Sequence, residues 1–190
     1  MRVIAGTQKG RRLHGPKGPD LRPTADRVKE ALFSILGARV AGARFLDLFA
    51  GTGAIGIEAL SRGAASVMFV ESSPSAGRIL KTNLAACGLE AKAHLYLSQA
   101  ETFLRSQRAG AVAFDIIFAD PPYQFDPTAT LWPILSRTTA LAPGGLLVFE
   151  HATKLALPPA IPSLSLLRQY HYGDTTLSVF ECTAQDGAVS

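Results

Sequence analysis

The chain has 190 residues, of which 47% are hydrophobic and 18% charged, so it is long enough for one domain with its own core. It holds no uninterrupted apolar run of about 18 residues, which argues against a membrane span, and its hydrophobic content argues against a disordered chain. Cys87 and Cys182 lie far apart without a His cluster, so we expect no disulfide scaffold and no metal. The N-terminus leads into basic residues instead of an apolar leader, so we expect a cytoplasmic protein.

Positive charge is concentrated near the N-terminus. Residues 1–44 hold ten Lys and Arg against three acids, a net +7, whereas the rest of the chain holds nine against twelve, a net −3. A basic segment on a near-neutral body is typical of an appendage that binds a polyanion, because each phosphate contact releases condensed counterions. A basic surface that serves only solubility is the alternative.

Glycines and prolines break residues 2–22 into short apolar pieces, which predicts a small hairpin and a loop outside the core. We therefore expect a basic arm over residues 1–22 and a single domain over residues 23–190. Apolar residues at helical spacing predict the first helix of that domain, capped by Thr24 and ended by Gly37.

From Arg44 onward, short apolar runs alternate with helical stretches, which is typical of an α/β fold with a mostly parallel sheet and helices on both faces. Strands are expected over residues 44–49, 66–70, 92–97, 113–119 and 144–150. Helices are expected over residues 54–62, 74–87, 99–107 and 128–140. The proline-rich linker 151–163 is too short for a crossover helix, so residues 164–172 and 175–182 are predicted to form a C-terminal antiparallel hairpin.

The densest motif is a glycine turn after the first predicted strand. Gly51, Gly53 and Gly56 follow the pattern GxGxxG between a strand and a helix, where the backbone must turn tightly and admit a ligand. This motif predicts a Rossmann-like cofactor site, and it fits NAD as well as S-adenosylmethionine.

Two acidic residues flank this turn. Asp47, at the strand end, would repel a pyrophosphate but could attract the ammonium group of a methionine moiety. Glu71, at the end of the second strand, could accept hydrogen bonds from both ribose hydroxyls of either cofactor. The alternatives are structural, since Asp47 could cap the following turn and Glu71 could cap the helix that begins at residue 74.

The segment Asp120-Pro121-Pro122-Tyr123 follows the fourth predicted strand directly. Ligands of open parallel sheets bind at the carboxyl ends of strands near a switch in strand order, so we expect this segment to face the cofactor. Asp120 and the Pro121 carbonyl could each accept one N–H of an amine on a base ring, which exposes the nitrogen lone pair to an electrophilic methyl group. The prolines fix the backbone, and Tyr123 offers a face on which the base can stack. A plain turn is the alternative.

With these motifs together, the chain resembles the class I S-adenosylmethionine-dependent methyltransferases and, more narrowly, the RsmD family of bacterial 16S rRNA guanine-N2 methyltransferases. The resemblance is carried by the arm, by residues 21–30, by residues 47–63 and by residues 120–123. The last two segments are shared by many amino-methyltransferases, whereas the arm and the Arg-Pro-Thr segment make the match narrow. The resemblance implies S-adenosylmethionine as cofactor. It also implies methyl transfer to the N2 amine of a particular guanine in small-subunit ribosomal RNA, within an assembled or partly assembled subunit.

The resemblance implies further cofactor contacts. Arg22 and Thr24 would lead to the methionine end of the cofactor, and Thr52 belongs to the glycine turn that holds it. The family class often has an acidic residue and then a small one after the third strand, and these positions are Gln99 and Ala100 here. Gln99 could still accept a hydrogen bond from the adenine amine through its side-chain oxygen.

The resemblance also implies RNA contacts. Arg27 would lie near the target pocket, and the basic arm would bind phosphates through Lys9, Arg11 and Arg12. We expect a monomer, and we expect no membrane partner.

Three alternatives stay open. An adenine-N6 methyltransferase acting on DNA or RNA could use the same Asp-Pro-Pro-Tyr segment, although DNA enzymes of that type generally carry a target-recognition domain for which the chain has little room. That shortage favours an exposed RNA base. An NAD-dependent oxidoreductase would leave Asp47 and the Asp120 segment unexplained, and a non-catalytic RNA-binding protein would not need Asp120.

Overall fold

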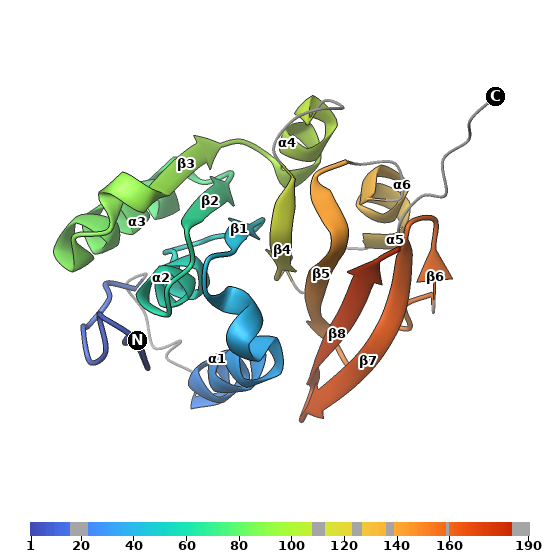
Figure 1. Ribbon diagram of the computed structural model, residues 1–190, viewed down its shortest axis with the longest axis horizontal. Coiled ribbons are helices and arrows are strands. Elements are labelled where there is room, and N and C mark those ends of the chain that lie inside the picture. The colour runs from blue at the N-terminus through green and yellow to red at the C-terminus, as the bar shows by residue number, and fades with distance from the viewer. Residues whose placement is uncertain (16–22, 108–112, 123–126, 136–138, 159, 184–190) are drawn as a thin grey trace. The chain divides into compact units, whose positions relative to one another are not determined.

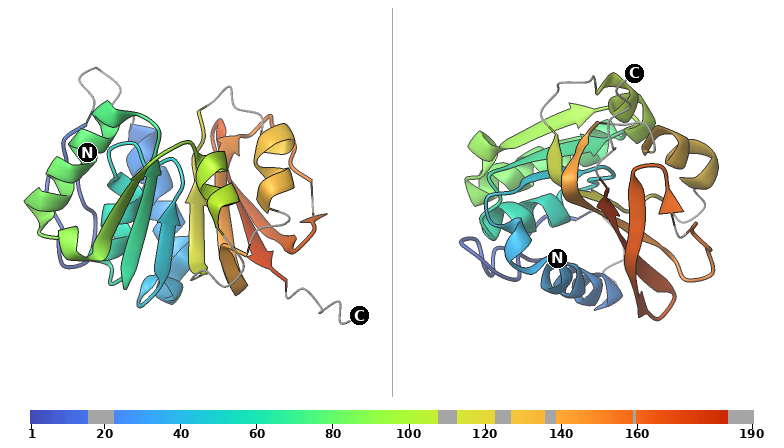
Figure 2. Two further views of the ribbon diagram at one scale, coloured as in Figure 1. Left: turned by 90° about the horizontal axis from the view of Figure 1, so that it is seen from above. Right: turned by 45° about the vertical axis from the view of Figure 1, so that its right-hand side comes forward.

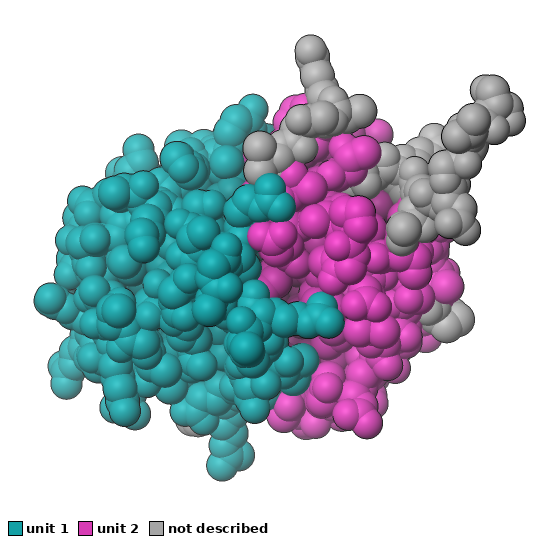
Figure 3. Space-filling view, viewed as in Figure 1, with its two compact units in different colours: residues 1–100 teal, residues 101–190 magenta. Residues whose placement is uncertain are grey.

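The computed structural model describes residues 1–15, 23–107, 113–122, 127–135, 139–158 and 160–183. The described residues belong to two compact units, residues 1–100 and residues 101–190 (Figure 3). Figures 1 and 2 show the strands and helices of each unit. None of the helices in the described ranges is long and apolar enough to cross a bilayer.

The first unit is built on three parallel strands in the order β3-β2-β1, covered by helices. A Cβ on Gly56 would lie 2.2 Å from the Phe69 ring, and a Cβ on Gly77 would lie 3.4 Å from the Leu95 side chain. Phe69 and Leu95 are register partners and share a face of the strands, so the helices that carry these glycines cover the same face. The elements are α1 (Pro23–Leu36), η1 (Gly37–Val40), β1 (Arg44–Asp47), α2 (Ala54–Ser61), β2 (Ser66–Glu71), α3 (Pro74–Cys87), η2 (Glu90–Lys92) and β3 (Ala93–Leu97), with α4 (Ala100–Ser106) beginning at the last residue of the unit.

The second unit has the strand order β4-β5-β8-β7-β6, in which β4 and β5 are parallel and the other pairs are antiparallel. The Trp132 ring packs on one face of these strands, 5.1 Å from the Phe149 ring and 5.5 Å from the Phe180 ring. Glu150 follows Phe149 in β5, so its side chain belongs to the opposite face. The elements are β4 (Phe114–Ala119), α5 (Pro127–Thr130), α6 (Trp132–Leu135), β5 (Leu141–Ala152), β6 (Ala160–Ile161), β7 (Leu164–Tyr172) and β8 (Thr175–Cys182).

Several predicted elements need correction. The single helix predicted over residues 128–140 is replaced, where the chain is described, by the short helices α5 and α6, because Pro133 has no N–H to continue the backbone ladder. Thr24 lies inside the first turn of α1 and does not cap it, since the helix begins at Pro23. The other predicted strands and helices are present with shifts of a few residues, and β6 was not predicted.

The N-terminal arm packs more tightly than expected. Arg2 pairs with Arg12 in an antiparallel bridge, which gives residues 1–13 a hairpin-like path. Val3 is 1% exposed and Leu13 is 7% exposed, so the arm contributes side chains to the core. The expectation of a hairpin outside the core was therefore wrong for these two residues.

Candidate functional site

The glycine turn between β1 and α2 has the conformation that its sequence requires. Gly51 and Gly53 have φ angles of +53° and +83°, a region that side chains with a Cβ rarely adopt. A Cβ on Gly51 would meet no described atom within 4 Å, so the turn borders open space where a ligand can approach. Gly56 has a different reason, since it allows α2 to pack directly on Phe69.

Glu71, at the end of β2, holds the glycine turn in place. Its Oε2 accepts the Gly51 N–H at 2.7 Å, and its Oε1 accepts the Ser73 N–H at 2.6 Å at the start of α3. Each carboxylate oxygen keeps a second lone pair, so the half-buried side chain can still accept two hydroxyl hydrogen bonds. The residues present therefore fit an adenosine-containing cofactor, and the structural role of Glu71 does not compete with that use.

Asp47 lies deeper in the unit. The residue is 1% exposed, and its Oδ2 accepts the Gly56 N–H at 3.1 Å in the first turns of α2. This contact is the structural role that the sequence left open for Asp47. Its predicted contact with an ammonium group stays a prediction.

The segment after β3 lies beside Glu71 along the backbone, because the Ser98 N–H donates to the Glu71 carbonyl at 3.0 Å. Gln99 is exposed there, and Ala100 is buried at the start of α4. Arg22 and the Thr24 side chain lie outside the described residues, so their expected cofactor contacts stay predictions.

Asn83 on α3 joins the arm to the glycine turn, and the sequence analysis missed it. Its Oδ1 accepts the His14 N–H at 2.7 Å, while its Nδ2 donates to the carbonyls of His14 at 3.0 Å and of Thr52 at 2.9 Å. The side chain is fully buried. The available signal was an Asn on the apolar stripe of a helix, three residues after Leu80, where a buried amide must find partners.

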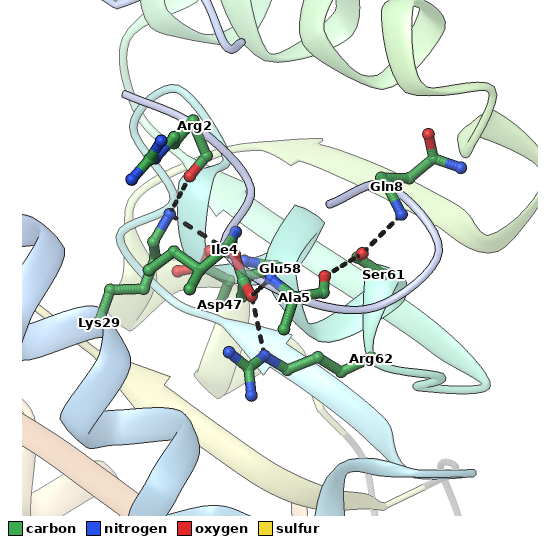
Figure 4. A network of polar contacts seen from close by, with 10 residues as sticks. Arg2, Ile4, Ala5, Gln8, Lys29, Asp47, Glu58, Ser61 and Arg62 are labelled. Carbon is green, nitrogen blue, oxygen red and sulfur yellow. Dashed lines mark hydrogen bonds and ion pairs between the residues drawn. The ribbon is translucent and has the colours of Figure 1, made fainter. Parts of the chain in front are cut away.

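Glu58 also anchors the arm (Figure 4). This residue of α2 is 0% exposed, and its carboxylate accepts the N–H groups of Ile4 at 2.7 Å and Ala5 at 2.9 Å. The Arg62 Nε donates to the same carboxylate at 2.8 Å. One buried anion therefore binds two backbone donors of the arm and the cation of Arg62, the residue that follows α2.

Lys29 on α1 completes this network. Its Nζ donates to the Arg2 carbonyl at 2.6 Å and lies 3.6 Å from Glu58 Oε2. Burial lowers the pKa of Lys29, and the Glu58 charge opposes that shift. The arm also packs tightly against α2 at Gly6. A Cβ on Gly6 would lie 1.8 Å from the Ser61 carbonyl oxygen, so no side chain fits at this position.

The docked arm presents its predicted RNA contacts to solvent. The side chains of Lys9, Arg11 and Arg12 are exposed, and Arg27 on α1 is exposed too. Buried contacts fix the backbone of the arm while its cationic side chains stay exposed to solvent. Phosphates could therefore bind without the cost of first ordering the arm.

In the second unit, Asp120 and Pro121 follow directly after β4. Asp120 and Pro122 are exposed, Pro121 is half-buried, and Tyr123 lies outside the described residues. Ala119 pairs with Phe149 in the parallel register of β4 and β5, so the next residues along the two strands, Asp120 and Glu150, are neighbours at the strand ends. Within the described part of the chain, neither carboxyl group has a hydrogen-bond partner.

Sequence analysis missed Glu150, although its signal is the same as that of Asp120: a carboxyl group directly after a buried apolar run. Partial burial raises the pKa of Asp120 to about 6. Burial and the neighbouring Asp120 charge raise the pKa of Glu150 to about 8. The pair therefore retains one proton at neutral pH. No group of three or more His, Cys, Asp or Glu side chains among the described residues is placed to hold a metal ion.

Comparison with known proteins identifies the family. The family model described as conserved hypothetical protein 95 matches residues 1–181. Ribosomal RNA small subunit methyltransferase D of Escherichia coli is 35% identical over 186 residues, which cover 97% of this chain and 91% of that protein. The chain belongs to the RsmD family.

Two further comparisons match along nearly the whole chain. The YlbH protein of Bacillus subtilis is 38% identical over 181 residues, covering 95% of this chain and 98% of that protein. The solved structure of yhhF from Escherichia coli is 35% identical, covers 97% of this chain and 99% of its own, and superposes with a TM-score of 0.84. The predicted Rossmann-like class I methyltransferase fold with a C-terminal antiparallel hairpin is confirmed.

Replacing Glu58 by Gln tests the anchor of the arm. The neutral amide would leave the buried Lys29 cation without the Glu58 charge that balances it, so we expect the free energy of unfolding to fall by about 3–5 kcal/mol. Hydrogen exchange of the amides in residues 2–14 is expected to accelerate more than exchange in β1–β3. The double variant Lys29→Met/Glu58→Gln removes both charges and is expected to recover part of the loss. Equal stability of the single and double variants would contradict the ion-pair account.

The raised pKa values of Asp120 and Glu150 predict that the free energy of unfolding falls as pH rises. Both carboxyl groups bind protons more tightly when folded than when unfolded, so stability is fully present below the unfolded pKa and is lost as pH rises toward about 8. Asp120→Asn and Glu150→Gln are therefore expected to raise the melting temperature at pH 8.5 relative to wild type, and to change it little at pH 4. Thermal unfolding at both pH values measures this. The exposed Glu90→Gln variant is the control, and an equal gain in it would refute the assignment.

Proposed function

We propose that the chain transfers a methyl group from S-adenosylmethionine to the exocyclic N2 amine of a specific guanine in 16S rRNA, on an assembled or partly assembled small ribosomal subunit. The observation that carries this proposal is Asp120, an exposed carboxyl group that follows a buried strand, precedes Pro121 and Pro122, and has no hydrogen-bond partner among the described residues. Membership of a family whose relatives are named rRNA small subunit methyltransferases supports the substrate. The exposed cations of the arm support an RNA partner.

The cofactor would be held by the first unit. Gly51, Thr52 and Gly53 would line its approach, Glu71 would bind the ribose, and Gln99 with Ala100 would border the adenine. Arg22, Thr24 and Asp47 would serve its methionine end. When bound, S-adenosylmethionine supplies an electrophilic methyl group on a sulfonium.

Asp120 and the Pro121 carbonyl act on the amine. A guanine N2 lone pair is delocalised into the ring, which makes the free amine a poor nucleophile. Two acceptors that hold its two N–H groups favour a tetrahedral nitrogen and localise the lone pair. Because partial burial raises the pKa of Asp120, its carboxylate is also a better proton acceptor than a free Asp when the amine gives up its proton. Tyr123 would stack on the base.

The arm supplies RNA affinity in this proposal. Lys9, Arg11, Arg12 and Arg27 would contact phosphates, which position the RNA without reading its sequence. Specificity would come from the shape of the subunit around an exposed base and from the groups that contact that base.

The test incubates the protein with methyl-labelled S-adenosylmethionine and small ribosomal subunits from cells that lack the modification, beside naked rRNA and duplex DNA. The labelled nucleoside is then identified. Label in N2-methylguanosine from the subunit is the expected result. Label in N6-methyladenine would overturn the proposed substrate, and label in no nucleoside would overturn the proposed activity.

Asp120→Ala removes an acceptor that the proposal places in the transition state. We expect turnover to fall by about 100-fold or more, while the dissociation constant of S-adenosylmethionine changes little. Single-turnover methyl transfer and equilibrium cofactor binding measure the two quantities. The exposed Glu90→Ala variant is the matched control. A loss of cofactor affinity as large as the loss of turnover would contradict this role.

Replacing Arg11 and Arg12 by Ala tests the arm. Each lost phosphate contact is expected to reduce the slope of log affinity against log salt by about 1, so the double variant should flatten it by about 2. Titration of labelled rRNA at several salt concentrations measures the slope. The exposed Arg78→Ala variant on α3 keeps the arm intact and serves as control. An unchanged slope in the double variant would exclude these residues from the interface.

A further inference from the structure

Two carboxyl groups of the second unit stand side by side where an amine would bind, and only Asp120 has a role so far. Register partners in neighbouring strands share a face and lie about 5 Å apart. Ala119 and Phe149 are such partners, and Asp120 and Glu150 follow them on the opposite face. Both carboxyl groups are without hydrogen-bond partners among the described residues, although Glu150 is half-buried. A half-buried carboxyl group that has no such partner can exchange water for a hydrogen bond to a ligand.

The described strands beside Glu150 offer its carboxyl group no hydrogen-bond partner. Its register partner on β8 is Leu177, which offers no polar group. Beyond Leu177 on the same face, β7 carries Arg168 and Tyr170, and the Arg168 guanidinium lies over the Tyr170 ring at 5.7 Å. Asp120 is therefore the ionisable group next to Glu150 among the described residues of these strands, with Arg168, Tyr170 and Tyr172 two strands away.

We propose that Glu150 is a specificity-determining residue whose carboxyl group pairs with the N1–H and O6 of the target guanine while Asp120 accepts an N–H of the adjacent N2 amine. This inference rests on the proposed function and names the group that selects the base.

The chemistry of the two partners is complementary. A protonated carboxyl group presents a carbonyl acceptor beside an O–H donor, and guanine presents the N1–H donor beside the O6 acceptor. The two edges form a cyclic pair of hydrogen bonds, in which the Glu150 carbonyl accepts N1–H and its O–H donates to O6. Burial and the Asp120 charge keep the proton that this pairing requires, since they raise the pKa of Glu150 to about 8.

The same arrangement disfavours adenine. If the N6 amine of adenine took the place of guanine N2, the neighbouring ring nitrogen would accept the Glu150 O–H. The Glu150 carbonyl would then face a C–H group and lose its partner. An unpaired acceptor in a partly desolvated site is costly, so guanine is favoured over adenine.

The test uses Glu150→Ala and Glu150→Gln with two substrates. Small subunits are reconstituted from rRNA that carries either guanine or 2-aminopurine at the labelled nucleotide. 2-Aminopurine keeps the N2 amine but lacks both N1–H and O6. Wild type is expected to lose at least about tenfold in kcat/KM on 2-aminopurine, and Glu150→Ala to lose as much on guanine with little further loss on 2-aminopurine. Gln presents the same donor and acceptor as a protonated Glu, so Glu150→Gln is expected to retain activity on guanine.

A pH profile supplies the readout that a merely structural role would not move. Wild-type activity on guanine is expected to fall above pH about 8, as Glu150 loses its proton, whereas Glu150→Gln does not titrate and should keep its activity. The Asp120 charge is present in both proteins over this range, and Glu90→Gln controls for the loss of a surface carboxylate.

The outcomes separate the inference from the proposed function. Absence of N2-methylguanosine with the wild-type protein would overturn the proposed function and this inference with it. A wild-type protein that methylates guanine, combined with equal discrimination against 2-aminopurine by wild type and Glu150→Ala, would overturn the role of Glu150 alone. If Glu150→Ala does not fold, the profile of Glu150→Gln decides, and a fall above pH about 8 that matches wild type would overturn the role.

Discussion

The first unit depends on one buried carboxylate. Glu58 satisfies its negative charge with two backbone N–H groups of the arm, the Arg62 side chain and Lys29 of α1. A charge with no exposure to solvent is tolerated only when such partners surround it, so the arm, α1 and α2 must take up their positions together. This interaction also positions the exposed cations of the arm, because Glu58 holds the backbone of the arm at Ile4 and Ala5.

A second set of polar contacts within the same unit fixes the glycine turn between β1 and α2. Glu71 holds Gly51 and Ser73, and Asn83 holds His14 and Thr52. These side chains bind backbone groups of loops, which have no ladder of their own to satisfy them. The glycine turn is therefore preorganised by residues of β2 and α3, and the energy of a bound ligand is not spent on ordering it.

Much of the fold and part of the site follow from sequence alone. The alternation of apolar runs and helical stretches predicted β1 to β5, β7 and β8 but not the short strand β6, because strand and helix periods differ and the glycines at 51, 53 and 63 mark the boundaries. The helix over residues 128–140 was wrong because Pro133 outweighs a helical apolar pattern. Local sequence singled out Asp120 and Glu71, because each follows an apolar run directly, and their roles toward base and cofactor stay predictions.

The residues that sequence analysis missed share a physical reason. Glu58, Asn83 and Lys29 bind backbone groups of the arm that are 27 to 69 positions away. A local pattern can place a polar residue on the apolar stripe of a helix, as it does for Asn83, but it does not identify the distant segment that the residue binds. Glu150 differs, because it repeats the local signature of Asp120 and becomes informative only when the register places the two strands side by side. The resemblance to the family allowed the overall architecture to be predicted. The long-range pairings of these residues are seen only in the folded structure.

The docking of the arm has a consequence for how the protein can be re-engineered. A basic hairpin at a chain end looks like a detachable module that could be exchanged between relatives to change RNA preference. Here side chains of three helices form hydrogen bonds with the backbone of the arm: Lys29 of α1, Glu58 of α2 and Asn83 of α3. A transplanted arm will keep its orientation only if Lys29, Glu58 and Asn83 are transferred with it. The hairpin and the three helix residues that bind it must therefore be exchanged together.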